Sequence, residues 1–129
     1  MKKIVLSIFF VLIIFIFGCT RGNVTGGVST DVSGTLNGDT RVVNVKAFRF
    51  DFDPNPIIVN QGEKVKLIVT SLDTAHGIAI PEYNINVPVP VGRPTTIEFV
   101  ADKAGTFNFF CNVYCGSGHG GMRGRLIVK

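Results

Sequence analysis

The chain of 129 residues has no tryptophan, two histidines and three cysteines, and it lacks the motifs of the common enzyme classes. No phosphate-binding loop, dinucleotide fingerprint, serine–histidine–aspartate arrangement or plausible carboxylate pair is present in it. His76 and His119 are its only imidazoles, so a general base of that type has few candidates. These absences argue against catalysis by this chain alone.

An excess of charge of one sign is also missing. The formal net charge is +4, and it falls to +2 if Lys2 and Lys3 leave with a cleaved N-terminal segment. No basic stripe with interleaved aromatic residues is visible, so we expect no nucleic-acid partner.

Residues 1–18 predict a signal peptide or a membrane anchor. Two lysines precede an apolar run over residues 4–17 that a single serine interrupts. A membrane-spanning helix needs about 20 apolar residues, so this run suits the core of a signal peptide better. Residues 16–19 resemble a bacterial lipobox, which makes Cys19 the expected lipidation site. The alternative is an uncleaved anchor helix, and in both cases the folded part is expected, membrane-anchored, on the outer (periplasmic or extracytoplasmic) face of the cytoplasmic membrane.

The remaining chain divides into a tether and one small domain. Residues 19–40 are rich in glycine, serine, threonine, asparagine and aspartate and contain no aromatic residue, which predicts a flexible tether. Residues 41–129 show short alternating runs separated by glycine and proline, without a helical period. The alternation changes phase between residues 43–47 and 48–52, which indicates a bulge or a bend. We therefore predict an all-β domain built as a β-sandwich.

Soft metal ligands are concentrated near the C-terminus. Cys111, Cys115, His119 and Met122 lie within twelve residues, and His76 is the one further histidine of the chain. Sulfur and imidazole donors favour copper over magnesium, calcium or manganese, which prefer oxygen. A blue-copper site uses one cysteine, two histidines and a weak axial methionine, whereas this chain offers two cysteines. Two bridging thiolates can hold two copper ions side by side.

The spacing Cys-x3-Cys-x3-His-x2-Met resembles the binuclear CuA motif of the cytochrome c oxidase subunit II family. The resemblance extends over residues 42–129 and includes Pro-Asn-Pro at 54–56, Asp-Thr-Ala-His-Gly at 73–77 and Asn-Val at 86–87. It implies a Greek-key cupredoxin-like β-sandwich. The chain is most similar to the short members of the family that have a single anchor and also lack tryptophan beside the site.

The resemblance implies a centre of two copper ions with six ligands: bridging Cys111 and Cys115, His76 with Met122 on one ion, and His119 with the backbone carbonyl of Val113 on the other. Many family members carry glutamate at the position of Val113, but a carbonyl ligand does not depend on the side chain. Asp73 could hold His76 through a hydrogen bond, or it could be an ordinary turn residue. Phe48 or Phe50 is the candidate for the place of the missing tryptophan.

By the same resemblance, the chain would transfer electrons through this centre. It would accept them from a cytochrome c and pass them to the catalytic subunit of a haem-copper terminal oxidase, after a copper-delivery factor has supplied the metal. One alternative is a free-standing, lipid-anchored CuA carrier that serves another reductase. Another is a module that holds or delivers copper.

The residues alone leave other interpretations of the ligands open. Cys111 and Cys115 could form a disulfide, which is common outside the cytoplasm. His76 could be a surface or core residue. Two cysteines with two histidines could also bind structural zinc, although zinc leaves Met122 without a role.

Overall fold

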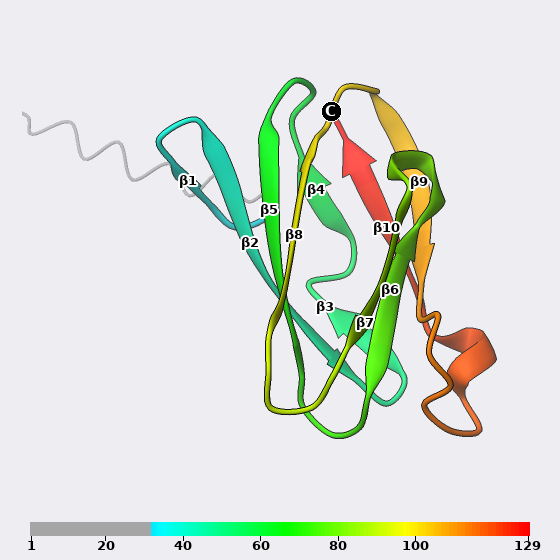
Figure 1. Cartoon of the computed structure of the whole chain (residues 1–129). Coiled ribbons are helices and arrows are strands. Elements are labelled where there is room, and N and C mark those ends of the chain that lie inside the picture. Colours follow the sequence, from blue (N-terminus) through cyan, green and yellow to red (C-terminus); the bar gives the residue numbers. More distant parts are fainter. Residues whose placement is uncertain (1–31) are drawn as a thin grey trace, which may run out of the picture.

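The computed structural model describes residues 32–129, which form two β-sheets packed face to face (Figure 1). The expectations for residues 1–18 and for Cys19 lie outside the described residues. Within residues 32–129, no helix has the length and apolar character needed to cross a membrane. The helical turns in this part are two short 3-10 helices, η1 at Pro81–Tyr83 and η2 at His119–Gly121. The all-β sandwich predicted from the sequence is confirmed.

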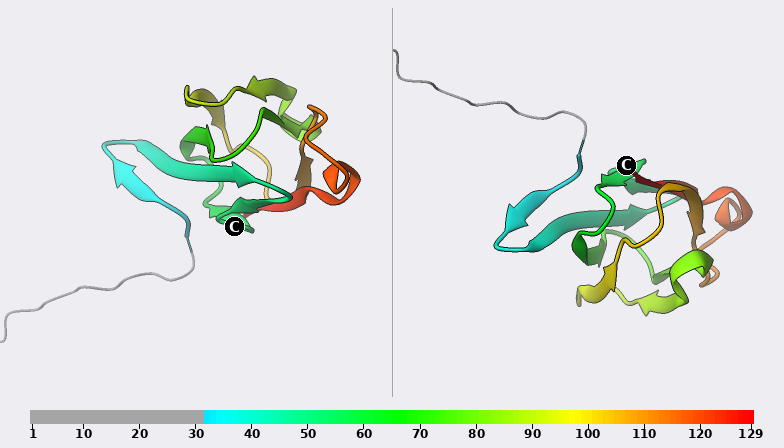
Figure 2. Two further views of the ribbon diagram at one scale, coloured as in Figure 1. Left: turned by 90° about the horizontal axis from the view of Figure 1, so that it is seen from below. Right: turned by 90° about the horizontal axis from the view of Figure 1, so that it is seen from above.

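The ten strands are β1 (Thr35–Asn37), β2 (Thr40–Phe48), β3 (Asp51–Asp53), β4 (Ile57–Val59), β5 (Lys64–Ser71), β6 (His76–Ile80), β7 (Ile85–Val89), β8 (Thr95–Val100), β9 (Gly105–Phe110) and β10 (Arg123–Val128). The first sheet has the order β1-β2-β5-β8, with β3 paired to β2, and the second has the order β4-β10-β9-β6-β7. Both sheets are mixed, because β2 runs parallel to β5 and β4 runs parallel to β10. The two layers are visible from both ends of the sandwich (Figure 2).

The core lies between the sheets and consists of the inward-facing residues, which alternate with outward-facing residues along strands such as β5. In β5, Val65, Leu67 and Val69 are buried, as their alternation with polar residues predicts. Phe52 on β3 and Phe109 on β9 meet edge to face, with ring centroids 5.1 Å apart. Each such buried side chain stabilises the fold by about 1.5–3 kcal/mol. The packing therefore gives the second sheet a rigid base for the loops at its ends.

The change of phase near residue 48 corresponds to a tight turn. Strand β2 ends at Phe48, and β3 begins at Asp51 and pairs antiparallel with β2. Arg49 and Phe50 lie between the two strands and are joined by a cis peptide bond. The turn ends the inward alternation of β2 and starts a new one at Phe52.

A second hairpin joins β1 to β2 and lies inside the range 19–40, for which the composition predicts a tether. Its two-residue turn consists of Gly38 and Asp39, and Gly38 supplies the positive φ that such a turn requires. Ser33 also donates from its backbone N to the carbonyl oxygen of Ile58 at 2.6 Å. In the described part of this range, the chain is therefore paired with the sandwich.

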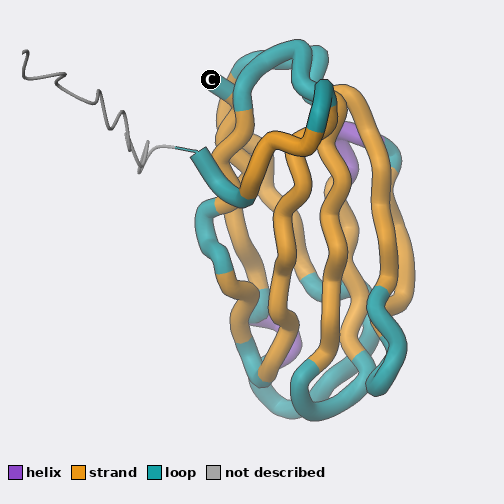
Figure 3. Tube along the Cα trace, turned by 90° about the vertical axis from the view of Figure 1, so that its left-hand side faces the viewer, coloured by secondary structure: helices purple, strands orange, loops and turns teal. Residues whose placement is uncertain are grey.

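The loops gather at the two ends of the strands (Figure 3). At one end of the second sheet, β6 begins, β9 ends and β10 begins (Figure 1). Residues 111–122 connect β9 to β10 there and contain the cysteine-rich motif. The topology therefore brings the start of β6, with His76, to the loop that follows β9.

Candidate metal centre

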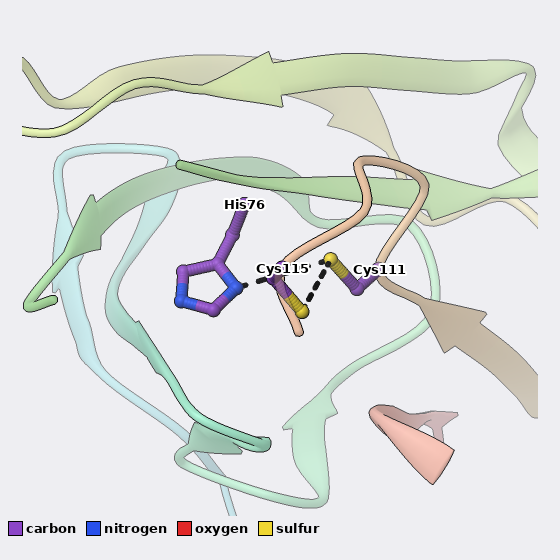
Figure 4. A group of neighbouring side chains, drawn as sticks. All are labelled: His76, Cys111 and Cys115. Carbon is purple, nitrogen blue, oxygen red and sulfur yellow. Dashed lines mark hydrogen bonds between the residues drawn. The ribbon is translucent and has the colours of Figure 1, made fainter. Parts of the chain in front are cut away.

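Two thiols and one imidazole meet in the interior at this end of the sandwich (Figure 4). His76 is the first residue of β6, Cys111 follows β9 directly, and Cys115 lies four residues further along the loop. Cys111 Sγ is 3.9 Å from His76 Nδ1 and 3.8 Å from Cys115 Sγ. All three side chains are buried, and one ligand atom from each lies within 4.8 Å of the others. Three soft donors are thus within reach of a common ion or ion pair.

The other residues of the predicted ligand set surround this group. Cys115 Sγ is 3.6 Å from His119 Nδ1 and 3.7 Å from Met122 Sδ. The thiol of Cys111 donates to the carbonyl oxygen of Val113 at 3.0 Å. Met122 is fully buried, whereas His119 is partly exposed. The structure therefore brings together all six residues that the sequence singled out.

The chemistry of this donor set fits copper. Cys111 and Cys115 are both free thiols, and their sulfur atoms lie well beyond the roughly 2 Å of a disulfide bond. A tetrahedral zinc site would use four of the donors and leave the buried Met122 thioether unused. Thiolate, thioether and imidazole donors together are typical of copper sites.

Backbone hydrogen bonds hold the loop in shape. The amide of Cys111 donates to the carbonyl of Met122 at 3.1 Å, which closes the loop at its base. The amide of His119 donates to the carbonyl of Gly116 at 3.0 Å and starts η2. Gly116 has a φ of +135°, a conformation that favours glycine. Glycine is therefore favoured at this position of the loop.

The turn between β2 and β3 closes over this loop. The ring of Phe50 packs so closely on the glycines that a Cβ atom at Gly118 would lie 2.3 Å from Phe50 Cδ2. Arg49 donates from Nε to the carbonyl oxygen of Cys115 at 3.0 Å. Phe50 is one of the two aromatic candidates expected near the site, whereas the contact of Arg49 was not expected from the sequence. The local sequence does not distinguish Arg49 from any other exposed cation.

Asp73 lies behind His76 and holds the ring in place. Its Oδ1 lies 2.6 Å from His76 Nε2, and its Oδ2 accepts a hydrogen bond from the amide of Arg49 at 2.7 Å. Burial would raise the pKa of Asp73, but hydrogen bonds from His76, Arg49 and the amide of Thr74 hold it below the ordinary value. Because Nε2 faces the carboxylate, Nδ1 is the nitrogen that faces Cys111 and can act as a ligand. Of the two roles considered for Asp73, the structure supports the hydrogen-bond partner.

Asn112 is a second residue that the sequence did not single out. Its Nδ2 donates to Asn86 Oδ1 on β7, while its own Oδ1 is buried without a hydrogen-bond partner. This oxygen lies against Gly77, where a Cβ atom would come within 1.6 Å of it. Asn112 therefore packs the base of the loop onto the strand that carries His76.

The site is screened from water on its inner side. Phe109, two residues before Cys111, is fully buried, whereas Phe110 faces outward with 38% of its surface exposed. Burial raises the pKa of the Cys115 thiol, and the neighbouring Cys111 thiol adds to this rise. A bound cation has the opposite effect, because metal coordination deprotonates thiols. A bound cation would therefore be needed to favour the thiolate of Cys115.

Comparison with known proteins agrees with this geometry. Residues 8–128 match the family described as a cupredoxin-like domain. Cytochrome c oxidase subunit 2 of Thermus thermophilus is 41% identical over 87 residues, which cover 67% of this chain and 64% of that protein. Nitrous-oxide reductase of Cupriavidus necator is 36% identical over 97 residues, which cover 72% of this chain and 15% of that protein.

Solved structures show the same architecture. A chain in the structure of a heme-copper terminal oxidase dimer has a TM-score of 0.65 and 30% sequence identity, and the match covers 75% of the present chain and 71% of that chain. The present chain spans between half and two thirds of the length of the two Thermus subunit 2 relatives. The similarity therefore concerns a domain of these proteins.

Proposed function

The chain belongs to the cupredoxin-like domain family, and on this basis we propose that it is an electron-transfer protein with a binuclear copper centre. The observation that carries the proposal is the pair of buried, free thiols whose sulfur atoms lie 3.8 Å apart. One cysteine suffices for a blue-copper site. A second thiol at this distance, with further donors around both, supports two ions bridged by both sulfurs.

The donors divide into two groups around the thiols. His76 lies beside Cys111, and His119 lies beside Cys115, so each imidazole would serve one of the two ions. The resemblance to the CuA family would pair Met122 with His76 on one ion and the carbonyl of Val113 with His119 on the other. This pairing does not follow from the distances to single thiols, since Met122 Sδ lies 3.7 Å from Cys115 Sγ and Val113 O lies 3.0 Å from Cys111 Sγ. Bound copper would supply one-electron redox chemistry.

The protein residues contribute positioning and exclusion of water. Asp73 fixes the ring of His76, and the hydrogen bond between Cys111 and Met122 closes the loop. Because these contacts are made between groups of the protein itself, they would hold the ligands in place when the charge of the centre changes. Little rearrangement favours fast electron transfer at a small driving force.

We propose that the electrons come from a cytochrome c and pass to a haem-copper terminal oxidase. The 41% identity to an oxidase subunit 2 supports this assignment. A partner can approach the centre closely, because Tyr114 on the loop is 77% exposed and its ring lies 5.6 Å from that of His119. The electron path would therefore leave or reach the site through the exposed loop.

The proposed location is the outer, periplasmic or extracytoplasmic face of the cytoplasmic membrane. Cys19 would carry a lipid anchor there, or the N-terminal segment would remain as a helix. We further propose that a delivery factor supplies the copper, because the centre needs two ions and both of its thiols must be reduced to bind them.

Metal analysis combined with electron paramagnetic resonance of the copper-loaded chain tests the function. We expect two copper ions per chain and one unpaired electron shared between two copper nuclei. A single copper ion with hyperfine structure from one nucleus would contradict the binuclear centre. Electron transfer from a reduced cytochrome c to the loaded chain, followed by stopped-flow absorbance, tests the donor.

A second candidate is a CuA carrier that serves another reductase. The 36% identity to a nitrous-oxide reductase is the observation in its favour. Both candidates share the same centre, so the acceptor separates them. Oxygen consumption by membranes that lose this chain would fall in the first case and stay unchanged in the second.

A further inference from the structure

We propose that Arg49 is a positioning residue of the copper centre, one that also adjusts its reduction potential; this inference rests on the proposed function. Arg49 lies in the turn between β2 and β3, on the first sheet, whereas the sulfur ligands lie on a loop of the second sheet. It is the residue through which the first sheet contacts both the loop and the partner of His76.

Two hydrogen bonds give Arg49 this role. Its guanidinium Nε donates to the carbonyl oxygen of Cys115 at 3.0 Å. Its backbone amide donates to Asp73 at 2.7 Å, and the other oxygen of Asp73 contacts His76. One residue thus connects a bridging cysteine to the imidazole that comes from a strand 35 residues earlier than Cys111. Movement of the turn would displace both ligands together.

The next residue reinforces the contact. The ring of Phe50 lies against Gly116 and Gly118, so a Cβ atom at either glycine would come within 3.0 Å of it. Arg49 and Phe50 therefore act on the same loop, one by a directed hydrogen bond and the other by packing. This hydrogen bond to the metal loop distinguishes Arg49 from an arginine whose side chain contacts only solvent.

The charge of Arg49 has a separate effect. An arginine stays protonated at any pH at which the protein is folded. A fixed positive charge beside the site favours the form of the centre that holds one more electron, because unlike charges attract more strongly near a protein interior than in water. Arg49 should therefore raise the reduction potential of the copper centre.

The test compares three variants of the full-length chain in detergent. Arg49→Met removes the charge and the side-chain hydrogen bond to Cys115, while Arg49→Lys keeps the charge but loses the planar Nε donor. The backbone hydrogen bond to Asp73 stays in both variants. Lys46→Met is the matched control, because Lys46 is an exposed cation on β2, three residues before Arg49, and forms its ion pair with Asp53 on β3. Thermal unfolding of each metal-free variant establishes that it folds.

We expect Arg49→Met to bind copper about 10-fold less tightly than wild type, a typical effect of losing an outer hydrogen-bond partner of a metal ligand. Its reduction potential should fall, whereas Arg49→Lys should keep a potential near that of wild type. Without metal, the amides of residues 115–118 should exchange hydrogen faster in both Arg49 variants than in Lys46→Met. This last measurement does not depend on copper.

The proposed function and this inference fail in different ways. If wild type takes up no copper, the proposed function is wrong. If wild type takes up copper and Arg49→Met matches Lys46→Met in affinity, potential and amide exchange, then Arg49 is an ordinary surface residue and the inference is overturned.

Discussion

A methyl group added at Gly118 should loosen the metal loop, and the structure indicates why. Gly118 has φ −90° and ψ 4°, which other residues also adopt, so alanine causes no backbone strain there. The obstacle is steric, because its Cβ atom would lie 2.3, 2.5 and 2.8 Å from three carbon atoms of the Phe50 ring. Either the ring or the loop must therefore move, and the residue next to Gly118 is the proposed ligand His119.

The expected cost follows from overpacking. Forcing an extra methyl group into a well-packed contact costs about 1–3 kcal/mol. A loss of 1 kcal/mol lowers the Tm of a domain of this size by roughly 4–8 °C, so a clear shift is expected for Gly118→Ala. Copper should also dissociate faster from Gly118→Ala than from wild type, since His119 moves with the loop.

Gly120→Ala is the matched control on the same loop. A Cβ atom at Gly120 meets nothing within 4 Å, so alanine should leave the Tm unchanged or raise it slightly. Phe50→Leu provides a second check through a double-mutant cycle. Because leucine removes the ring that the added methyl group would strike, Gly118→Ala should cost less in that background.

Calorimetry of the metal-free variants and competition with a copper chelator measure these effects. Equal Tm values for Gly118→Ala and Gly120→Ala would show that Phe50 does not pack on the loop as described. An additive double mutant would lead to the same conclusion.

Three further predictions concern other parts of the chain. Cys115→Ser should abolish the binuclear signal, because one thiolate cannot provide both bridges. Met122→Leu should shift the reduction potential but keep copper bound, because the thioether is a weak axial ligand. Metal analysis measures the copper content of each variant, and voltammetry measures its potential. Glu63→Gln should lower the free energy of unfolding at pH 7 by about 1–2 kcal/mol, because Glu63 forms a half-buried, two-bond ion pair with Arg41. The hydrogen bond from Arg41 lowers the pKa of Glu63 to about 2 from an ordinary 4.5. This stabilisation is therefore complete above pH 4.5 and is lost as the pH falls towards 2. The free energies of unfolding of wild type and Glu63→Gln, measured across this range, should become equal near pH 2. Cys19→Ala should block lipidation, which intact-mass measurement of the purified protein detects. If the wild-type mass instead corresponds to a chain that begins at Met1 and carries no lipid, an anchor helix is favoured.

The position of the site could be predicted because most of its ligands are close in sequence. Cys111, Cys115, His119 and Met122 identify one another by spacing alone. His76 is distant, and its inclusion depended on the resemblance to a family. The structure brings all of these residues together, while the binding of two copper ions by them stays a prediction.

The strands could be predicted where one face is buried, as in β5, because alternation records burial directly. The contacts of Arg49 and Asn112 could not. Each depends on which strands become neighbours across the sandwich, and the sequence pattern of a turn does not contain that information. The same limit explains why the hairpin of β1 fell within a predicted tether, since Leu36 is exposed and adds little apolar burial.

The two sheets hold the proposed ligands in different ways, and this difference determines which substitutions can act on the centre from outside. His76 starts β6, and Cys111 and Met122 are joined by a backbone hydrogen bond at the base of the loop, so the second sheet itself fixes these three. Val113 still lies against Gly77 of β6, but Cys115 and His119 lie further out on the loop, outside the strands. There Arg49 donates to the carbonyl of Cys115 and Phe50 packs on Gly116 and Gly118, and both residues come from the turn between two strands of the first sheet. The packing of one sheet on the other therefore determines whether the second thiol stays opposite the first, and a change in the β2–β3 turn can alter copper binding without touching a ligand.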